Sequence, residues 1–442
     1  MGVMDTMRRT LFGLPTLSND AKRASAWADY GYPEHLGFDN YYAMFCRGGI
    51  ARAGVMRHVE KSWETNPWIV EGEEGDKPRT DWSEWELTVA RLCRELQLWG
   101  RLSAADWRNR VGRYAGLYLT FGDGLTPDQP VTHGAKLIKV KPLFESQLEP
   151  SAWNDDPASP EYGQPSMYQL KQSSADQGPV GESLQIHPDR VHIIAEGADD
   201  DSIYGTPALE PGFNSLLDIE KIRGAGGEGF WKAARGAWSL EGEADAQQLA
   251  TMLGVPQDQV AEALNDTAAD FAAGMDKLLM LGGMTAKSLT FTVPDPQKFF
   301  DIAAADFAAS VSCPLPILLG QQISQRSSDE NAREWQQTIM SRRRQFLGPN
   351  IESLVRHLMR LGTLPARDRF YVAWDDLTDA TATEKLDNAK SMSETNRNNA
   401  MGGLQPSFTE NEIREAAGLD ADASLDGGLG YDEDPAADPA EE

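Results

Sequence analysis

The chain has 442 residues, a formal net charge of −27 and 40% hydrophobic residues. Tight binding to nucleic acid through its phosphates needs clustered lysine and arginine, so this charge excludes such a binder, but not a protein past which DNA slides. The three cysteines lie far apart without the spacing of a zinc site, and no apolar run approaches the roughly 18 residues of a membrane span.

The first half of the chain alternates predicted helices and strands, which is typical of an α+β fold. From Phe38 to Trp63 apolar residues recur at steps of three and four, which predicts a helix interrupted at Gly48 and Gly49. A polar segment at 151–183 is rich in Asp, Ser, Gly and Pro, and the short strand patterns MYQL and, later, SLQI occur in this region. The other predicted elements are helices at 85–98 and from an N-cap at Ser103, and strands at 117–124, 137–144 and 190–197.

The second half contains two helix patterns that flank a smaller segment of mixed character. The first helix, within 207–235, carries Leu216 and Ile219 on its apolar side. Residues 236–295 combine helix patterns with a strand at 288–295, which predicts a small α/β module. The second helix, at 296–312, has Ala and Phe at helical spacing.

A polar loop and a long helix follow the second of these helices. Pro314 and Pro316 break the helix, and the chain then turns polar as GQQISQRSSDE. A new helix pattern begins at Ser328 and continues beyond residue 360. Pro349, behind Gly348, lacks an amide hydrogen, so we expect a kink there.

The glycine-rich segment 224–229, GAGGEG, is not a phosphate-binding loop. A P-loop ends in Gly-Lys-Ser/Thr, which places an ammonium group on the phosphates, and this ending is absent. The glycines interrupt a helix pattern instead of following a strand. We therefore expect a hinge at Gly226 and Gly227, or close packing of helices.

No other pattern predicts catalysis, a cofactor or a metal site. His187 and His192 flank the short segment PDRV, and residues five apart on a strand point to opposite faces, which makes a metal site improbable. Asp375 and Asp376 follow a strand, as metal-binding carboxylates do in nucleases, but the following Thr-Asp-Ala-Thr favours a capping role. Because no nucleophile motif is present either, the sequence predicts a protein that is not an enzyme.

The basic cluster of the long helix has two interpretations. Arg342, Arg343 and Arg344 are consecutive, and Arg333 lies on the same helix. A solvated face, or pairing with acids of a neighbouring element, is the favoured interpretation. Contact with DNA phosphate, with a water-filled channel or with another subunit is the second, and it stays open.

The order of these elements resembles the portal proteins of tailed bacteriophages, in particular a portal group of siphophages and prophages. The resemblance extends over most of residues 38–375 and is strongest in the PLPILLG turn. The acidic tail and the segment 151–183 depart from it. The matching segments are ADWRNRVGRYAGLYL, KVKPLFESQLEP, RVHIIAEG with YGTPALEPGFNSLLDIEKI, and FDIAAADFAASVSCPLPILLG with SSDENAREWQQTI.

The resemblance implies a portal fold, with a wing, a two-helix stem, a small α/β clip and a helical crown, that assembles into a dodecameric ring. The implied parts are an arm at 1–37, a wing at 38–206 and 331–376, stem helices at 207–235 and 296–312, a clip at 236–295, a tunnel loop at 313–330, a crown at 377–420 and an acidic disordered tail at 421–442. The residues expected to form the tunnel loop are Gln321, Gln322, Ser324, Gln325, Arg326 and Ser327.

The implied function is a channel at one capsid vertex for packaging, retention and ejection of the genome. Its expected partners are other copies of itself, double-stranded DNA, the large terminase, the head–tail adaptor, and the major capsid protein or scaffold, with no membrane. The protein would be assembled in the cytoplasm of the bacterial host and reside in the virion. A phage phosphodiesterase that degrades cyclic oligonucleotides is disfavoured, because the paired His-x-Thr/Ser motifs are missing. A non-catalytic adaptor or scaffold is the other alternative.

Overall fold

The computed structural model describes residues 30–73, 81–171, 173–174, 178–179, 183–198, 202–235, 237–242, 246–263, 284–289, 295–320, 325–379 and 382–420. The chain divides into one compact unit of Met1–Trp335 with Ser341–Trp374 and another of Gln336–Met340 with Asp375–Glu442. Helices and strands occur together, as predicted for an α+β fold. No helix among the described residues is long and apolar enough to cross a membrane.

An antiparallel sheet of three strands forms the centre of the first unit. Its strand order is β3 (Leu137–Phe144), β2 (Ala115–Phe121) and β9 (Val191–Ile194). All three strands were predicted, and β3 has the predicted bounds. Burial of β2 at almost every position explains why its sequence lacks a clear alternation of polar and apolar residues.

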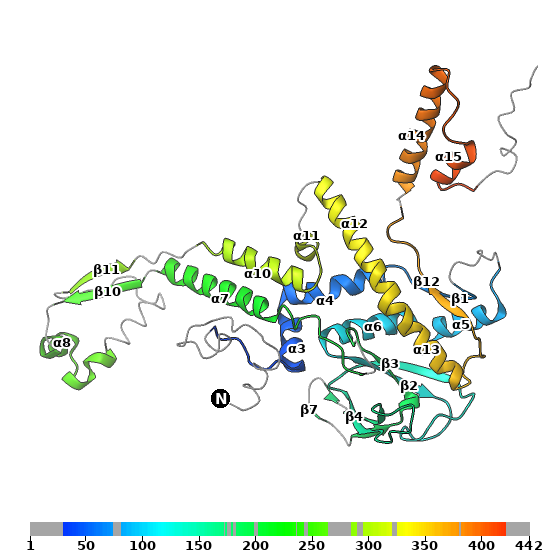
Figure 1. Cartoon of the computed structure of the whole chain (residues 1–442). Helices are drawn as coiled ribbons and strands as arrows, with labels where there is room; N and C mark the ends of the chain where they lie inside the picture. The colour runs from blue at the N-terminus through cyan, green and yellow to red at the C-terminus, as the bar shows by residue number, and fades with distance from the viewer. Residues whose placement is uncertain are drawn as a thin grey trace, which may run out of the picture. The chain divides into compact units, whose positions relative to one another are not determined.

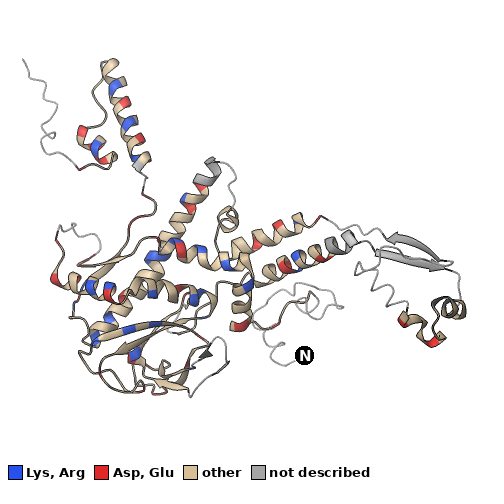
Figure 2. Ribbon diagram, turned by 180° about the vertical axis from the view of Figure 1, so that it is seen from behind, with Lys and Arg blue, Asp and Glu red and all other residues tan. Residues whose placement is uncertain are grey.

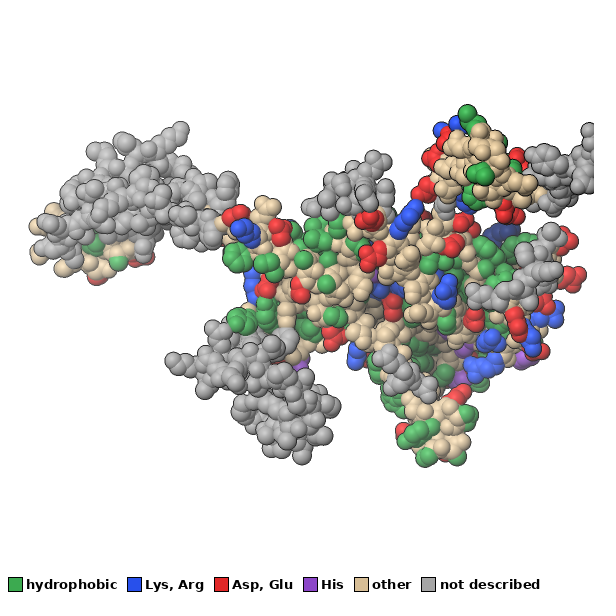
Figure 3. All heavy atoms as spheres, turned by 45° about the horizontal axis from the view of Figure 1, so that its top comes forward, with side chains coloured by type: hydrophobic (Ala, Val, Ile, Leu, Met, Phe, Trp, Pro, Cys, Tyr) green, Lys and Arg blue, Asp and Glu red, His purple; other side chains and the backbone are tan. Residues whose placement is uncertain are grey.

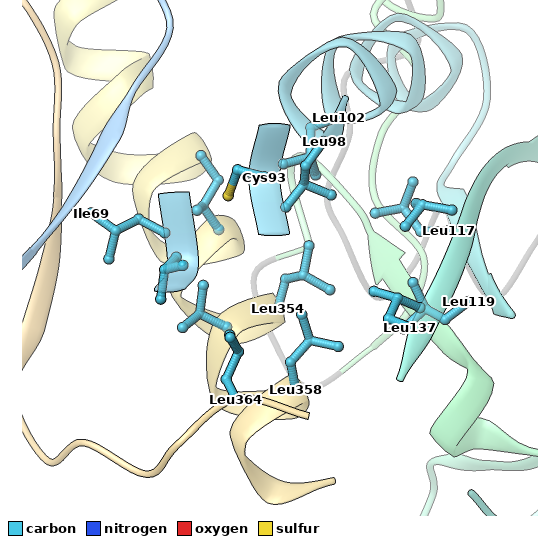
Figure 4. Packing of buried hydrophobic residues seen from close by; sticks show 14 of the residues in the cluster. Ile69, Cys93, Leu98, Leu102, Leu117, Leu119, Leu137, Leu354, Leu358 and Leu364 are labelled. Carbon is cyan, nitrogen blue, oxygen red and sulfur yellow. The ribbon is translucent and has the colours of Figure 1, made fainter. Parts of the chain in front are cut away.

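Three helices cover one face of this sheet and enclose the main hydrophobic core. They are α5 (Glu84–Glu95), α6 (Leu98–Val111) and α13 (Gly348–Arg360). Figure 4 shows leucines of α6 and α13 converging with leucines of β2 and β3. The predicted N-cap at Ser103 is wrong, because the helix already begins at Leu98, and Leu98 and Leu102 are both buried.

The edge of this core is a two-stranded sheet made from distant parts of the chain. β1 (Trp68–Glu71) pairs antiparallel with β12 (Phe370–Ala373). Trp85 of α5 packs on Phe370, and its indole N–H donates to the carbonyl of Pro365 at 2.8 Å. These contacts join the beginning and the end of the first unit.

A second antiparallel sheet packs on the other face of the central sheet. Its order is β4 (Leu148–Trp153), β5 (Pro165–Leu170) and β8 (Leu184–Ile186). Leu148 and Ile186 are completely buried in this cluster. Part of the polar segment 151–183 is therefore an ordered sheet with its own small core. Between the strands lie the pair β6 (Ser173–Ser174) and β7 (Gly178–Pro179), and η1 (Pro188–Arg190) precedes β9.

The predicted helix 38–63 is two helices, with the interruption where the glycines predicted it. They are α3 (Phe38–Arg47) and α4 (Gly49–Ser62). Gly48 lies between them, and a Cβ atom there would be 2.8 Å from the carbonyl oxygen of Met44. Glycine is required at this turn because a Cβ atom would clash with the backbone of the last turn of α3.

A helix pair, α7 (Phe213–Arg235) and α10 (Gln297–Ser310), lies side by side and extends from α3 and α4 (Figure 1). Ile219 of α7 packs on Ala303 and Ala304 of α10, together with the short helix α11 (Leu315–Leu319). The bounds agree with the two predicted helices, and we refer to them below as the α7–α10 pair.

Between α7 and α10 the described residues contain both strands and helix. β10 (Ala237–Gly242) pairs antiparallel with β11 (Met284–Leu289). α8 (Ala246–Leu253) and the 3-10 turn η2 (Gln257–Gln259) lie between them in sequence. The described residues of this segment thus include both strand and helix, as predicted; β11 overlaps the predicted strand 288–295 at Ser288 and Leu289, and residues 290–294 lie outside the described residues.

The second unit contains two helices of polar sequence, α14 (Ala382–Met401) and α15 (Glu410–Ala416). The side-chain oxygen of Asn396 accepts from the amides of Ser407 and Phe408, at 2.9 and 3.1 Å. Thr409 caps α15 in a capping box with Glu412. These local bonds hold the connection between two helices that bury few apolar residues.

Candidate functional site

The long helix continues through Gly348 and Pro349 without leaving a helical conformation. It consists of α12 (Gln325–Arg342), a π turn at Arg343–Leu347, and α13. The amide of Gly348 donates to the carbonyl of Arg343, five residues back. Because the hydrogen bonds of a π turn do not follow the α-helical pattern, the turn accommodates a residue such as Pro349 that has no N–H to donate. The structure thus has a π turn directly before this proline, and the kink predicted here stays a prediction.

Arg342, the last residue of α12, enters a buried network of charges. Its guanidinium donates to both carboxylate oxygens of Asp106, at 2.5 and 3.0 Å, and to both of Glu196, at 2.7 and 2.9 Å. Arg110 donates to Glu196 at 3.0 Å. Trp63 adds an indole N–H to Asp106 at 2.9 Å. We call Arg342, Arg110, Asp106 and Glu196 the Arg342 network.

Two positive and two negative charges balance within this network. Burial alone would raise the pKa of Glu196, but Arg342 and Arg110 more than offset this and lower it to about 2. Burial alone would lower the pKa of Arg342, whereas the charges of Asp106 and Glu196 raise it. Glu196 and Arg342 are therefore ionised near neutral pH, and each bidentate contact of Arg342 fixes the helix end against α6 and the segment after β9.

The four arginines of the predicted basic cluster have different environments. Arg342 and Arg343 are buried, with only 9% and 1% of their surface exposed. Arg343 donates to the carbonyl of Ser62 at 2.9 Å and lies over the ring of Trp374. The prediction of DNA or subunit contacts is wrong for these two, because the acids and carbonyls of their own subunit enclose them. Arg333 and Arg344 are exposed, and for them it stays a prediction.

The acidic partners of Arg342 were missed in the sequence, although a signal was present. Asp106, Asn109 and Arg110 lie on the same helical face as Leu102 and Ala105, and all five are buried. Polar residues in phase with an apolar stripe indicate an internal polar network. Glu196 gave no such signal, because it follows a strand in a loop.

The predicted tunnel loop is shorter than expected. Leu315–Leu319 forms α11, and α12 begins at Gln325, three residues before the predicted start. Gln325, Arg326 and Ser327 therefore belong to the first turn of α12 and not to a loop. None of these residue types prevents a helical conformation. Gln321, Gln322 and Ser324 lie outside the described residues.

The glycine segment 224–229 does not interrupt α7. The helix is continuous over all 23 of its residues. A Cβ atom added at Gly224, Gly226 or Gly227 would meet nothing within 4 Å in the part of the chain that the structure describes. The predicted interruption of the helix is wrong, because helical hydrogen bonds tolerate glycine; no described residue packs closely on these three glycines, and a hinge at Gly226 and Gly227 stays a prediction.

The exposed side of α10 carries two large apolar side chains among charged ones. Phe299 and Ile302 are 62% and 70% exposed and lie one helical turn apart. Hydrophobic side chains gather at the surface of the α7–α10 pair in Figure 3. Two neighbouring large apolar side chains seldom stay exposed to water, so we expect another surface to cover them.

The remaining candidate residues have structural roles. His187 caps η1 by accepting from the amide of Asp189. Asp376 accepts from the amide and hydroxyl of Thr378, at 2.8 and 2.7 Å, which is the favoured capping role. His192 is buried, and this burial lowers its pKa to about 3. Among the described residues no group of three His, Cys, Asp or Glu side chains is placed to hold a metal ion.

Comparison with known proteins gives a family and two similar structures. Residues 82–398 match the family described as phage portal protein. A solved structure titled "Neck of native GTA particle computed with C12 symmetry" is 14% identical, covers 88% of this chain and 95% of its own, and has a TM-score of 0.47. A second, "Virion of native gene transfer agent (GTA) particle", is 16% identical, covers 87% and 94%, and has a TM-score of 0.45. No curated protein matches the chain.

Proposed function

Because this chain belongs to the phage portal protein family, we propose that it assembles into a dodecameric ring at one capsid vertex and forms the channel for genome packaging, retention and ejection. The role is structural, with the ring as a conduit and no bond-making chemistry. The expected division into wing, stem, clip and crown belongs to the same proposal, with the α7–α10 pair as the stem.

The observation that carries the ring is the unpartnered surface of the α7–α10 pair. Phe299 and Ile302 project from α10, and the glycines of α7 leave room for a close approach. Neighbouring helices in a ring make heterologous contacts, in which one face of a subunit meets a different face of the next. An apolar ridge on α10 and a small-residue strip on α7 are suited to such a pairing.

The charge of the chain supports passage of DNA instead of binding. Each tight phosphate contact would have to be broken as the genome moves, and log K falls with salt in proportion to the number of such contacts. Lys and Arg alternate with Asp and Glu along the described helices (Figure 2). With a net charge of −27, only weak and transient contacts with DNA are expected.

Mass photometry and negative-stain imaging of the purified chain test the ring. We expect a discrete species of about a dozen copies, which Ile302→Asp disrupts because it buries an unpaired carboxylate in the contact. Tyr162→Asp is the matched control: Tyr162 is 59% exposed and lies on the loop between β4 and β5. A monomer under all assembly conditions, or rings unaffected by Ile302→Asp, would contradict the proposal.

A deletion that ends before α12 tests the tunnel-loop role. Removing residues 321–324 spares the first turn of α12, so the ring should still form. We expect packaging or retention of DNA to be impaired. Normal packaging by particles that carry this deletion would remove the loop from the mechanism.

The partners follow from the same assignment. We propose that residues 236–295 dock the large terminase during packaging and the head–tail adaptor afterwards, and that the ring contacts the major capsid protein or scaffold. One surface used in succession predicts competition, so saturating adaptor should displace terminase from isolated rings. Simultaneous binding of both would show that the two docking sites are separate.

A further inference from the structure

A group of aromatic rings from α3, α6 and the end of β3 lies at the surface of the first unit. Phe38 and Tyr42 of α3 both contact Phe144, and in each pair the ring centroids are 5.4 Å apart. Trp107 of α6 contacts the same ring at 5.2 Å, and Phe45 stacks on Trp107 at 5.4 Å. Of these five side chains only Phe45 is buried, and Tyr42 is 41% exposed. We call the five rings the α3–α6 aromatic face.

Two arginines lie on this face without a carboxylate partner. Arg108 of α6 lies over the rings of Trp107 and Phe144, at 4.3 and 5.0 Å from their centroids. Arg52 of α4 lies over Phe45 at 5.0 Å. One guanidinium N–H of Arg108 donates to a carbonyl of its own helix at 2.6 Å, and its Nε is buried without an acceptor among the described residues. Neither arginine forms an ion pair within the part of the chain that the structure describes.

The carboxylates of α3, α4 and α6, and the one beside Phe144, do not neutralise these two charges. Three of them are already engaged: Asp106 in the Arg342 network, Glu145 with Arg113 at 3.5 Å and Glu60 with Arg57 at 4.0 Å. Asp39, in the first turn of α3, is a single negative charge, and Arg47 in the last turn of the same helix adds a further exposed positive one. The face is therefore positive in a chain whose net charge is −27, and a segment that covers it is favoured if it brings carboxylates.

Residues 421–442 of this chain have the complementary composition. They include eight Asp and Glu side chains and no Lys or Arg. Tyr431 is followed directly by Asp432, Glu433 and Asp434, so one aromatic ring adjoins three carboxylates in the sequence. Aromatic rings pack edge-to-face or offset on other rings, and a carboxylate accepts two hydrogen bonds from one guanidinium.

We propose that the α3–α6 aromatic face is the docking site of residues 421–442 of this chain. The ring of Tyr431 packs against Tyr42 and Trp107, and the carboxylates that follow it pair with Arg108 and Arg52. One ring and two charge pairs on an open face give weak affinity, so a free partner at micromolar concentration would leave the face mostly empty. A segment tethered to the same protein acts at an effective concentration of up to about millimolar, which suits such a face.

A photocross-linker on the face identifies what covers it. In the full-length protein p-benzoyl-phenylalanine takes the place of Tyr42, and mass spectrometry identifies the peptide that it captures on irradiation. We expect a peptide from within residues 421–442. Arg108→Glu should lower the yield of this cross-link about tenfold, because it replaces a charge-assisted hydrogen bond by repulsion. The combined substitution Asp432→Asn, Glu433→Gln and Asp434→Asn should do the same, and it leaves α3, α4 and α6 unchanged.

Arg94→Glu is the matched control, because Arg94 is an exposed arginine of α5 that forms no ion pair with a described residue. It changes the net charge as much as Arg108→Glu does and should leave the yield unchanged. Arg108→Glu combined with Glu433→Arg should restore part of the yield, since the two charges are exchanged. Capture of a peptide from any other segment, no capture, or an equal loss in Arg94→Glu would overturn the proposal.

Discussion

Around Arg342 the charged groups have partners inside the subunit, whereas along the α7–α10 pair large apolar side chains face solvent. Asp106, Glu196 and Arg110 enclose Arg342 in a charge-balanced network. Phe299 and Ile302 on α10 have no comparable cover among the described residues. Two of the clustered arginines, Arg342 and Arg343, are thus internal, and the helix pair presents large apolar side chains at its surface.

The two regions differ in whether their interactions are complete within one subunit. The Arg342 network is complete in one subunit, so its residues act on the folding of that subunit. The α7–α10 pair buries only part of its apolar surface, so its exposed residues should act on assembly. Mutations in the two regions are therefore expected to separate folding from ring formation.

Arg342→Met should have the largest effect. It leaves the buried Asp106 and the partly buried Glu196 without their main partner, and breaking a buried ion pair costs about 3–5 kcal/mol. Urea unfolding of the dissociated subunit measures the loss. Arg344→Met, at the exposed end of the same cluster, should change the free energy of unfolding by less than about 0.5 kcal/mol. Equal effects of the two substitutions would refute the distinction between them.

Acid should weaken the same network. The pKa of Glu196 is about 2 in the folded state and about 4.3 in an unfolded chain. Its contribution to the free energy of unfolding is therefore complete above about pH 4.3 and is lost as the pH falls through about 2. The contribution is roughly 2–3 kcal/mol. Unfolding free energies measured between pH 5 and 2 should fall less steeply in Glu196→Gln than in the unchanged protein.

Gly54→Ala tests the close contact between α4 and α10. A Cβ atom at Gly54 would lie 2.7 Å from the end of the Phe307 ring, which is completely buried. Overpacking of this kind costs about 1–3 kcal/mol. The measurement is the urea midpoint; Gly49→Ala, where a Cβ meets nothing within 4 Å, is the control. An unchanged midpoint would mean that Phe307 moves aside freely.

Gly227→Ala should have the smallest effect on the subunit and the opposite sign. Alanine in a helix is favoured over glycine by about 0.8–1.0 kcal/mol, and a Cβ atom at Gly227 meets no described residue within 4 Å. We expect a slightly more stable monomer and fewer rings, because the methyl group would keep the neighbouring helix away. If stability and ring yield rise together, the glycines are not part of the subunit contact.

Much of the fold could be predicted from local patterns, and the candidate site only in part. The strand 137–144 and the helix break at Gly48 follow from periodicity and from glycine. The start of α12 was placed too late, because a polar Gln-Arg-Ser turn looks like a loop until a helix continues from it. The buried state of Arg342 depends on Asp106 and Glu196, which are 236 and 146 residues away.

The sequence of this protein by itself determined the α+β class, the order of its main elements and the resemblance of that order to phage portals, since these depend on short-range periodicity and on turn residues such as Pro314 and Gly48. Tertiary structure alone decided which arginines of Arg342–Arg344 are internal, that α7 runs through its glycines, and that Arg52 and Arg108 lie on one group of aromatic rings. Whether a residue is buried, paired with a charge or exposed depends on contacts between segments far apart in the chain. Local sequence patterns do not show which of these segments will be in contact.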